Sequence, residues 1–150
     1  MKGSTLAITF VAVTTTALAA PPTVTSATET QTFELISPCT GELITGTTTV
    51  ERETRLVEDA NGGFHFHVNA FFTGTYTGSA GTTFTDMVRS RLSVNVPASG
   101  GLIVTDLGTG HIMGSDGTKI LDRGRFTLVI GPDGNVRVER LNVGPICQKD

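Results

Sequence analysis

Turn-forming residues divide this chain at short, regular intervals, and that spacing is the feature that most limits its possible folds. The segments are "DANGG" at 59–63, "GSAG" at 78–81, "PASGG" at 97–101, "GSDG" at 114–117 and "GPDGN" at 131–135. Threonine, which suits the pleated surface of a sheet, occurs 26 times. The pattern predicts strands at about 32–37, 43–58, 64–77, 82–96, 102–113, 118–130 and 135–143.

Several of these predicted strands are twelve or more residues long, against a usual length of about five or six. Long antiparallel strands joined by tight hairpins form an up-and-down sheet, and such a sheet must curl or close to protect its edges. We therefore expect an all-β domain, an antiparallel up-and-down β-barrel of about seven or eight strands. A two-sheet β-sandwich built from the same strands is the alternative.

The first nineteen residues have the features of a signal peptide. Lys2 supplies a positive charge, "LAITFVAV" is a run of eight apolar residues, and "ALA" at 17–19 has the small residues of a cleavage site. The apolar run is too short to span a bilayer. We expect residues 1–19 to be removed and the mature chain to be secreted, with a retained N-terminal anchor as the alternative.

The segment after the leader lacks hydrophobic periodicity. Its letters at 20–31 are "APPTVTSATETQ", rich in proline, threonine and serine. Such a composition predicts a flexible N-terminal segment. The remaining residues, 32–150, are expected to form a single β-barrel domain.

The two cysteines, Cys39 and Cys147, lie near opposite ends of the mature chain. Cysteines of a secreted protein usually pair, and this pair would join the first strand to the last. Closing a loop of roughly 100 residues would remove about 4–5 kcal/mol of unfolded-state freedom in the chain-entropy model. Two free thiols or a metal pair are the alternatives, which an oxidising compartment disfavours.

The chain carries a formal charge of −3, which becomes −4 when Lys2 leaves with the leader. Its arginines are dispersed along the sequence. Arg89 and Arg91 are two residues apart in a predicted strand, on the side that alternation assigns to solvent, as is typical of surface residues. A mildly acidic chain without a basic run is a poor match for nucleic acid or for an anionic membrane. We expect a small molecule or an extracellular protein as partner, with no nucleic acid, no membrane span and no cofactor.

Two of the three histidines stand two residues apart in "GGFHFHVNAFF". Alternation places Phe64 and Phe66 on one face of this strand and His65 and His67 on the other, and the apolar face is expected to be buried. The pair is similar to the His-x-His metal motif of cupins but lacks the glutamate that follows there. Solvent-facing histidines are the preferred interpretation. A metal site of the catalytic zinc type, formed by His65, His67 and His111, is the alternative.

Polar residues also occur at positions that alternation assigns to the buried face: Arg52, Tyr76, Asp86 and Asp122. A buried charge is unfavourable unless it is paired, which suggests an internal Arg52–Asp86 pair. Together with Tyr76, this pair is the predicted ligand-binding set and would line a small cavity at one mouth of the barrel. A desolvated aspartate also has a raised pKa and can carry a proton. Alternatively, a β-bulge reverses the phase and these side chains reach water.

The segments "SPCTGELITG", "EDANGGFHFHVN" and "GPDGNVRVERLNVGPIC" together resemble small secreted bacterial proteins of no assigned function. Those chains have a leader, a Cys-Thr-Gly-Glu opening, an Asp-Ala-Asn-Gly-Gly hairpin and a closing cysteine. The resemblance covers most of the mature chain. It implies secretion and an all-β domain, and it implies no activity and no catalytic residue.

Three classes of function are compatible with these features. The first is a secreted, non-enzymatic module that binds a small, mostly apolar ligand inside the barrel. The second is an enzyme that uses the Arg52 and Asp86 interior or a histidine-bound metal, and the third is an extracellular protein-interaction or inhibitor domain. The sequence contains no nucleophile elbow and no phosphate-binding loop. We therefore expect the first class, and we assign no catalytic residue.

Overall fold

The computed structural model describes residues 21–148, and all of the regular secondary structure among them is β-strand. The predicted signal peptide at 1–19 lies outside these residues. The strands are β1 (Thr23–Ile36), β2 (Leu43–Glu58), β3 (Phe64–Gly78), β4 (Thr83–Val96), β5 (Leu102–Gly114), β6 (Lys119–Ile130) and β7 (Val136–Gln148). The prediction of an all-β domain is confirmed, and each of the five predicted turn segments joins two strands.

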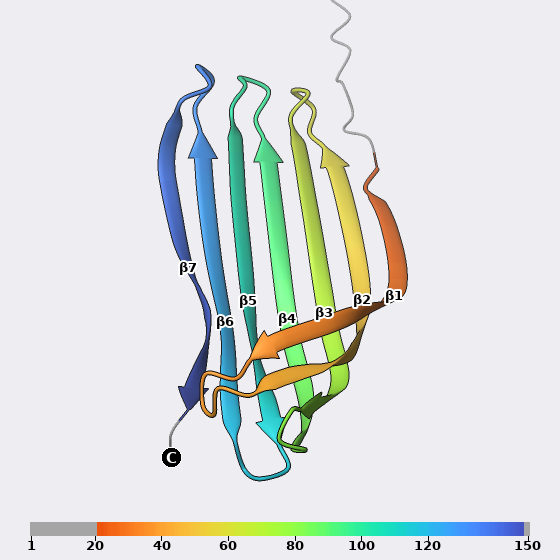
Figure 1. Ribbon diagram of the computed structural model, residues 1–150. Helices are drawn as coiled ribbons and strands as arrows, with labels where there is room; N and C mark the ends of the chain where they lie inside the picture. Colours follow the sequence, from red (N-terminus) through yellow and green to blue (C-terminus); the bar gives the residue numbers. More distant parts are fainter. Residues whose placement is uncertain (1–20, 149–150) are drawn as a thin grey trace, which may run out of the picture.

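The strands form one antiparallel sheet in which each strand pairs with its neighbours in sequence order, from β1 to β7. The predicted up-and-down arrangement is therefore confirmed. The sheet is not closed, because β1 and β7 form its two edges and are not paired with each other. The expected barrel thus stops short of closure within residues 21–148, and one curved sheet takes its place (Figure 1).

The sheet acquires an interior because one end of it folds over. The C-terminal part of β1 and the N-terminal part of β2 bend and cross in front of the neighbouring strands toward β7 (Figure 1). We call this crossing segment, Phe33–Gly46, the strap, the face that it covers the inner face, and the opposite face the outer face. The strap makes one end of the molecule two layers thick, whereas the other end remains a single sheet.

A disulfide bond between Cys39 and Cys147 fastens the strap to β7. The predicted pairing is confirmed, with the two Cα atoms 4.9 Å apart and 108 residues apart in the sequence. The bond joins the turn between β1 and β2 to the end of β7, so it crosses from the strap to the far edge of the sheet. It therefore holds two segments that share no strand pairing.

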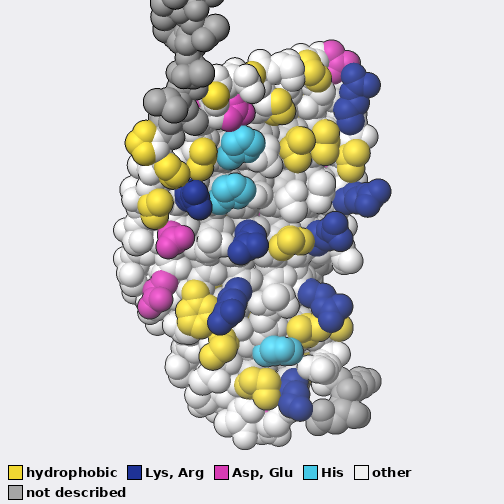
Figure 2. Space-filling model, turned by 180° about the vertical axis from the view of Figure 1, so that it is seen from behind, with side chains coloured by type: hydrophobic (Ala, Val, Ile, Leu, Met, Phe, Trp, Pro, Cys, Tyr) yellow, Lys and Arg dark blue, Asp and Glu magenta, His cyan; other side chains and the backbone are white. Residues whose placement is uncertain are grey.

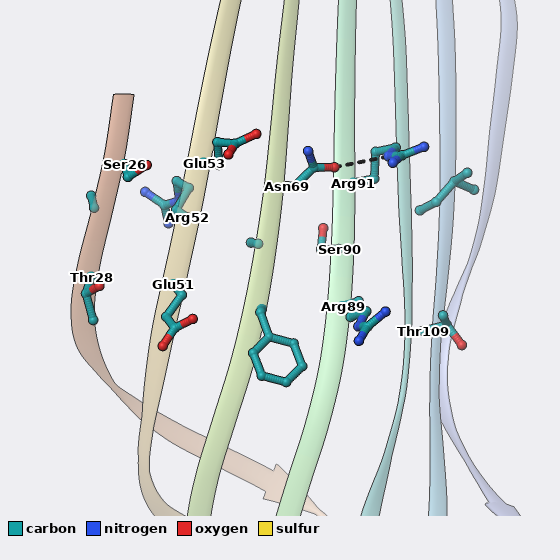
Figure 3. Close-up of a pocket in the computed structure, with 14 residues that line it drawn as sticks. Ser26, Thr28, Glu51, Arg52, Glu53, Asn69, Arg89, Ser90, Arg91 and Thr109 are labelled. Atoms are coloured by element: carbon teal, nitrogen blue, oxygen red, sulfur yellow. Dashed lines mark hydrogen bonds between the residues drawn. The ribbon is translucent and has the colours of Figure 1, made fainter. Parts of the chain in front are cut away.

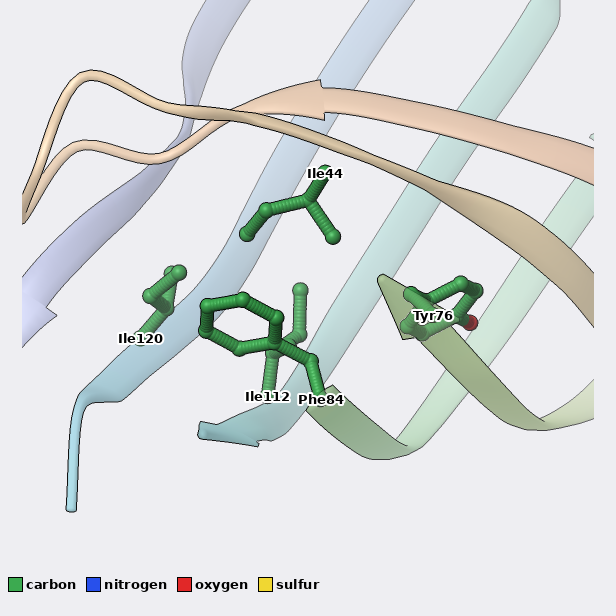
Figure 4. Packing of buried hydrophobic residues seen from close by; sticks show 5 residues of the cluster. All are labelled: Ile44, Tyr76, Phe84, Ile112 and Ile120. Atoms are coloured by element: carbon green, nitrogen blue, oxygen red, sulfur yellow. The ribbon is translucent and has the colours of Figure 1, made fainter. Parts of the chain in front are cut away.

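The hydrophobic core lies between the strap and the inner face. Its centre is formed by Ile44 from the strap and by four side chains of the sheet, which are Tyr76, Phe84, Ile112 and Ile120 (Figure 4). Each of these five is at most 2% exposed. Burial of an aliphatic or aromatic side chain of this size contributes about 1.5–3 kcal/mol. The rest of the strap packs on this cluster through Phe33, Leu35 and Cys39.

Glycines permit the close approach of backbone and side chains on the inner face. A Cβ atom at Gly46 would lie 2.6 Å from the carbonyl oxygen of Thr75, and one at Gly110 would lie 2.5 Å from Cα of Val88. Side-chain atoms do not tolerate such distances. At Gly108, on the same strand as Gly110, the nearest atom would be 3.9 Å away, which is ordinary contact.

A buried carboxylate connects the strap to the turn between β3 and β4. Glu42 is 8% exposed, and its Oε2 accepts a hydrogen bond from the backbone N–H of Ala80 at 3.1 Å. Its Oε1 accepts a hydrogen bond from the hydroxyl of Thr40 at 3.2 Å. Charge-assisted hydrogen bonds of this kind offset the desolvation of a buried carboxylate. The Cys-Thr-Gly-Glu segment therefore fixes the strap at both its cysteine and its glutamate.

The N-terminal boundary differs from the prediction. The segment 20–31 was expected to be flexible, but β1 begins at Thr23 and pairs with β2 over its whole length. Every residue from Thr23 to Thr32 is exposed, so this part of β1 has no apolar alternation that sequence reasoning can detect. Its pairing is explained by the length of β2, which offers unpaired backbone groups to the neighbouring segment.

The last strand contains a β-bulge. Val129 pairs with Val138 and Ile130 with Val136, so Arg137 is an extra residue in β7. A bulge reverses the alternation beyond it. Alternation in β7 is therefore interrupted at Arg137, whereas the pairing of β1 to β5 and of β5 with β6 has no register shift.

Removal of the disulfide is expected to weaken the fold strongly. The double variant Cys39→Ser with Cys147→Ser should lose about 2–5 kcal/mol of unfolding free energy. Without the disulfide the unfolded chain is no longer closed into a loop, so its conformational entropy is larger. Urea denaturation with and without reductant measures the loss. The reduced wild type should match the variant, and equal stability of the oxidised wild type and the variant would contradict a fastened strap.

Two glycines on one strand provide a matched test of the packing. Gly110→Ala is expected to destabilise the protein by about 2 kcal/mol or more, because a methyl group there meets backbone atoms. Gly108→Ala should change stability by no more than about 0.5 kcal/mol. Chemical denaturation followed by circular dichroism compares the two variants, and equal effects would show that Gly110 is not tightly packed.

Candidate functional site

A cavity of about 540 Å³ lies on the inner face beside the hydrophobic core. Residues of β1 and β2 cover it from one side, and the sheet forms the other side. We call it the inner cavity. Its apolar walls include Phe33, Phe72, Val88 and Pro145, and its polar lining includes Thr48, Asp86 and Asp122.

Asp86 and Tyr76 are brought together as predicted. The Tyr76 hydroxyl donates a hydrogen bond to Oδ2 of Asp86 at 2.5 Å. Asp86 lies opposite Gly74 in the strand register, and Gly74 has no side chain to separate the two groups. A Cβ atom at Gly74 would lie 2.6 Å from Cζ of the tyrosine ring. This glycine therefore makes room for the ring to lie along β3 and reach the carboxylate on β4.

The second carboxylate oxygen of Asp86 has no partner. Within residues 21–148, Oδ1 of Asp86 is the buried side-chain oxygen or nitrogen atom that lacks a hydrogen bond. A buried acceptor that loses water without gaining a donor is unfavourable by about 1–3 kcal/mol. Asp86 lines the inner cavity, and because its Oδ1 is itself buried, the side chain must turn slightly for a donor group of a bound molecule to reach this oxygen.

Asp122 adds a second carboxyl group to the inner cavity. It lies opposite Gly110, whereas Asp86 lies opposite Ile112 on the other side of β5. Burial raises the pKa of Asp122, and the nearby negative charge of Asp86 raises it further. The alternation of the sequence placed Asp122 on the inner face correctly but gave no indication that the sheet sets it beside Asp86.

The Tyr76 hydroxyl is a hydrogen-bond donor rather than a base. Burial raises its pKa, and its hydrogen bond to Asp86 raises the pKa further because ionisation would place two negative charges together. Its ring also packs against Phe33 of the strap, with ring centroids 4.4 Å apart. The tyrosine thus belongs both to the core and to the wall of the inner cavity.

Arg52 does not form the predicted pair with Asp86. Its guanidinium binds Glu29 of β1, with Nη2 2.8 Å from Oε1, and both side chains are more than one-third exposed. Arg52 lies opposite Ala70 on β3, whereas Asp86 lies opposite Gly74, four residues further along that strand. Alternation correctly placed both residues on the inner face. The strand register, however, places them in different rows of cross-strand neighbours.

His65 and His67 lie on the outer face, opposite to Phe64 and Phe66, as predicted. His65 Nδ1 lies 2.7 Å from Oδ1 of Asn95, and His67 Nδ1 lies 2.6 Å from Oγ of Ser93. His65 also lies close to Asp59 in the turn before β3, with Nε2 3.5 Å from Oδ2. The two imidazoles are therefore half-buried and hydrogen-bonded to neighbouring strands, and they are not simply solvated.

His111 is not brought to the other two histidines. It lies opposite Met87, whereas His67 lies opposite Ser93, six residues further along β4. Six residues of strand span roughly 20 Å. Two imidazoles lie together and the third lies apart on the outer face (Figure 2). Within residues 21–148, no group of three or more His, Cys, Asp or Glu side chains is placed to hold a metal ion.

Comparisons with known proteins gave no relative: no protein-family model, curated protein or solved structure matches this chain. In the part of the chain that the structure describes, no helix is both long and apolar enough to cross a membrane. Functional inference therefore depends on the inner cavity and on the surfaces themselves.

Neutralising Asp122 is expected to stabilise the protein at neutral pH. Because its folded-state pKa is raised, the charged form is disfavoured in the fold, and stability falls as the pH rises through that pKa. Asp122→Asn should raise the unfolding temperature at pH 7 by about 2–5 °C, with the gain fading as the pH falls toward 4.

Asp116 provides the control of opposite sign. Its pKa is lowered by hydrogen bonds from Thr118, so its charge favours the fold above pH 4. Asp116→Asn should give no gain at pH 7. Differential scanning calorimetry between pH 3 and 8 compares the two variants, and a gain for Asp122→Asn that does not depend on pH would contradict this account.

Proposed function

We propose that this protein is a secreted, non-enzymatic β-sheet module that binds a small, mostly apolar molecule carrying a cationic or hydrogen-bond-donating group. The observation that carries the proposal is the unpartnered Oδ1 of Asp86 in the lining of the inner cavity. A group that is unsatisfied in the free protein gains a partner when a donor binds.

The composition of the inner cavity supports this class of ligand. Phe33, Phe72 and Val88 provide apolar contact, and the carboxyl groups of Asp86 and Asp122 provide acceptors at one place. A volume of about 540 Å³ suits a small molecule. The Tyr76 hydroxyl is already used as a donor to Asp86, so the ligand must supply the remaining donor.

The polar groups of the inner cavity support binding more than catalysis. The Ser90 hydroxyl in the lining donates to Oδ1 of Asp106 at 3.1 Å, and a carboxylate alone is a weak activator of a serine nucleophile. The raised pKa of Tyr76 removes it as a base. Secretion is supported by the disulfide, which is typical of proteins of oxidising compartments.

An extracellular protein-interaction domain is the second candidate, because the inner face beyond the strap presents apolar side chains to solvent. Leu56, Phe64 and Leu141 are 41%, 42% and 66% exposed. Cross-strand pairing places half-buried Phe66, Val94, Val104 and Leu128 in one row of this surface. Contiguous apolar surface of this kind is typical of interaction sites.

The proposal predicts preferential binding of apolar amines. Calorimetric titration of the full chain with an aryl-alkyl amine, its neutral alcohol isostere and the matching carboxylate should rank them in that order of affinity. Asp86→Asn should weaken amine binding by about 10-fold or more, because the charge-assisted contact is lost. Phe72→Ala should weaken all three ligands, because it removes apolar contact.

Controls distinguish a site in the inner cavity from general charge effects. Asp116→Asn removes one negative charge from an exposed turn and should leave amine affinity unchanged. Native mass spectrometry before and after denaturation identifies any retained small molecule. Equal affinity of the amine for the wild type and for Asp86→Asn would end the proposal, and capture of a protein partner through the exposed apolar rows would favour the second candidate.

A further inference from the structure

Four arginines that are dispersed in the sequence form one rectangle on the outer face. Arg89 and Arg91 come from β4, and Arg123 and Arg125 come from β6. We infer that this arginine strip binds a linear sulfated polysaccharide that lies along β5. The four side chains belong to the outer face, although Arg123 also adjoins the inner cavity, and the inference does not use the Asp86 and Asp122 carboxyl groups of the proposed ligand site.

The strand register places these four residues together. Arg91, Leu107 and Arg125 are directly opposite one another, and Arg89, Thr109 and Arg123 form the next row on the same face. Residues two apart on a strand are separated by about 7 Å, and residues two strands apart by about 10 Å. The arginine strip therefore has two parallel columns of positive charge, and Leu107 and Thr109 form its floor.

Neighbouring side chains support two of the guanidinium groups. Arg91 donates from Nε to Oδ1 of Asn69 at 3.1 Å, and the guanidinium of Arg89 lies 5.6 Å from the ring centroid of Phe71. These contacts leave the terminal nitrogen atoms of both arginines available. In Figure 3 those nitrogen atoms lie on the β5 side of β4, over the floor of the arginine strip.

In the described part of the chain, no carboxylate forms an ion pair with the arginine strip. All four arginines are exposed, and none of them has an acidic partner within 4 Å among residues 21–148. The nearest acidic column on this face, Glu51 and Glu53 on β2, lies opposite Phe71 and Asn69, two strands from β4. Positive side chains gather on the part of the outer face that is remote from these glutamates (Figure 2).

Arginine side chains at fixed positions on a sheet are well suited to bind sulfate esters. A guanidinium presents two parallel N–H donors, which match two oxygens of one sulfate or phosphate group. Two columns of such groups at fixed spacing match repeated anionic groups along a chain. The depression of about 820 Å³ that adjoins Arg89 and Arg91 on the β1 side is also lined by Glu51 and Glu53, so the expected path of the polysaccharide follows β5 and does not enter this depression.

The same surface is a poorer match for nucleic acid or for a membrane. Single-stranded nucleic acid is bound by aromatic side chains that stack on bases. Within residues 21–148, Phe71 is the aromatic residue of the outer face, and it is half-buried beside Arg89. A flat anionic bilayer would meet Glu51 and Glu53 together with the arginines, whereas a narrow polysaccharide chain avoids these glutamates.

The test is binding of the full chain to immobilised heparin as a function of salt. Two double variants, Arg89→Gln with Arg91→Gln and Arg123→Gln with Arg125→Gln, should each weaken binding by about 10-fold or more. Each should also reduce the slope of log Kd against log salt by about 2, one for each lost contact. Arg55→Gln with Arg137→Gln removes the same charge elsewhere and should leave binding unchanged.

Further measurements compare heparin with other anions and test whether the paired donors of arginine are required. Replacing all four arginines of the strip by lysine keeps the charge and should weaken heparin binding by about 3-fold or more, because lysine lacks the paired donors. Single-stranded DNA, phosphatidylserine vesicles and unsulfated hyaluronan should bind more weakly than heparin at equal ionic strength. The inference is overturned by tighter binding of any of these three, by the absence of heparin binding at 50 mM salt, or by equal affinity of the glutamine variants and the wild type.

Discussion

The crossing of the strap over the inner face gives this sheet its interior. A single antiparallel sheet has no inside, and its apolar face remains open unless another element covers it. Here the cover is supplied by the bent ends of β1 and β2, fastened by the disulfide between Cys39 and Cys147 and by the buried carboxylate of Glu42. Ile44 of this cover packs on Tyr76, Phe84, Ile112 and Ile120 of the sheet, so the central cluster of the core lies where the strap is.

The border of the strap explains why the inner cavity combines apolar and acidic groups. Beneath the strap the sheet is filled by large side chains, whereas the lining of the inner cavity next to it includes Gly108 and Gly124, which have no side chains. Asp86 and Asp122 face this space, and within residues 21–148 neither forms an ion pair, because the register places Arg52 in another row, where it binds Glu29. The result is a partly desolvated pair of carboxyl groups, which raises the pKa of Asp122. Such an arrangement opposes stability and is typical of sites that bind a ligand.

The two faces of the sheet have different chemistry because each strand alternates. The inner face carries most of the apolar residues together with Asp86, Asp106 and Asp122, and the outer face carries the histidines, many of the threonines and the arginine strip. The Arg-x-Arg pairs at 89–91 and 123–125 are visible in the sequence, but they are separated by more than thirty residues and by one complete strand. Their convergence depends on β5, which places small and apolar side chains between them.

The sequence by itself determined the strands, the turns, the disulfide and the face to which Tyr76, Asp86, Asp122 and the histidines belong, since alternation and turn chemistry are local properties. It did not determine which residues of a face share a row, and it therefore gave Arg52 the wrong partner and left the position of His111 relative to the other histidines open. It also gave no sign that β1 begins at Thr23 or that the sheet folds over without closing. Those features depend on register, curvature and backbone contact at positions such as Gly46 and Gly110, and only the assembled sheet decides them because they join residues far apart in the chain.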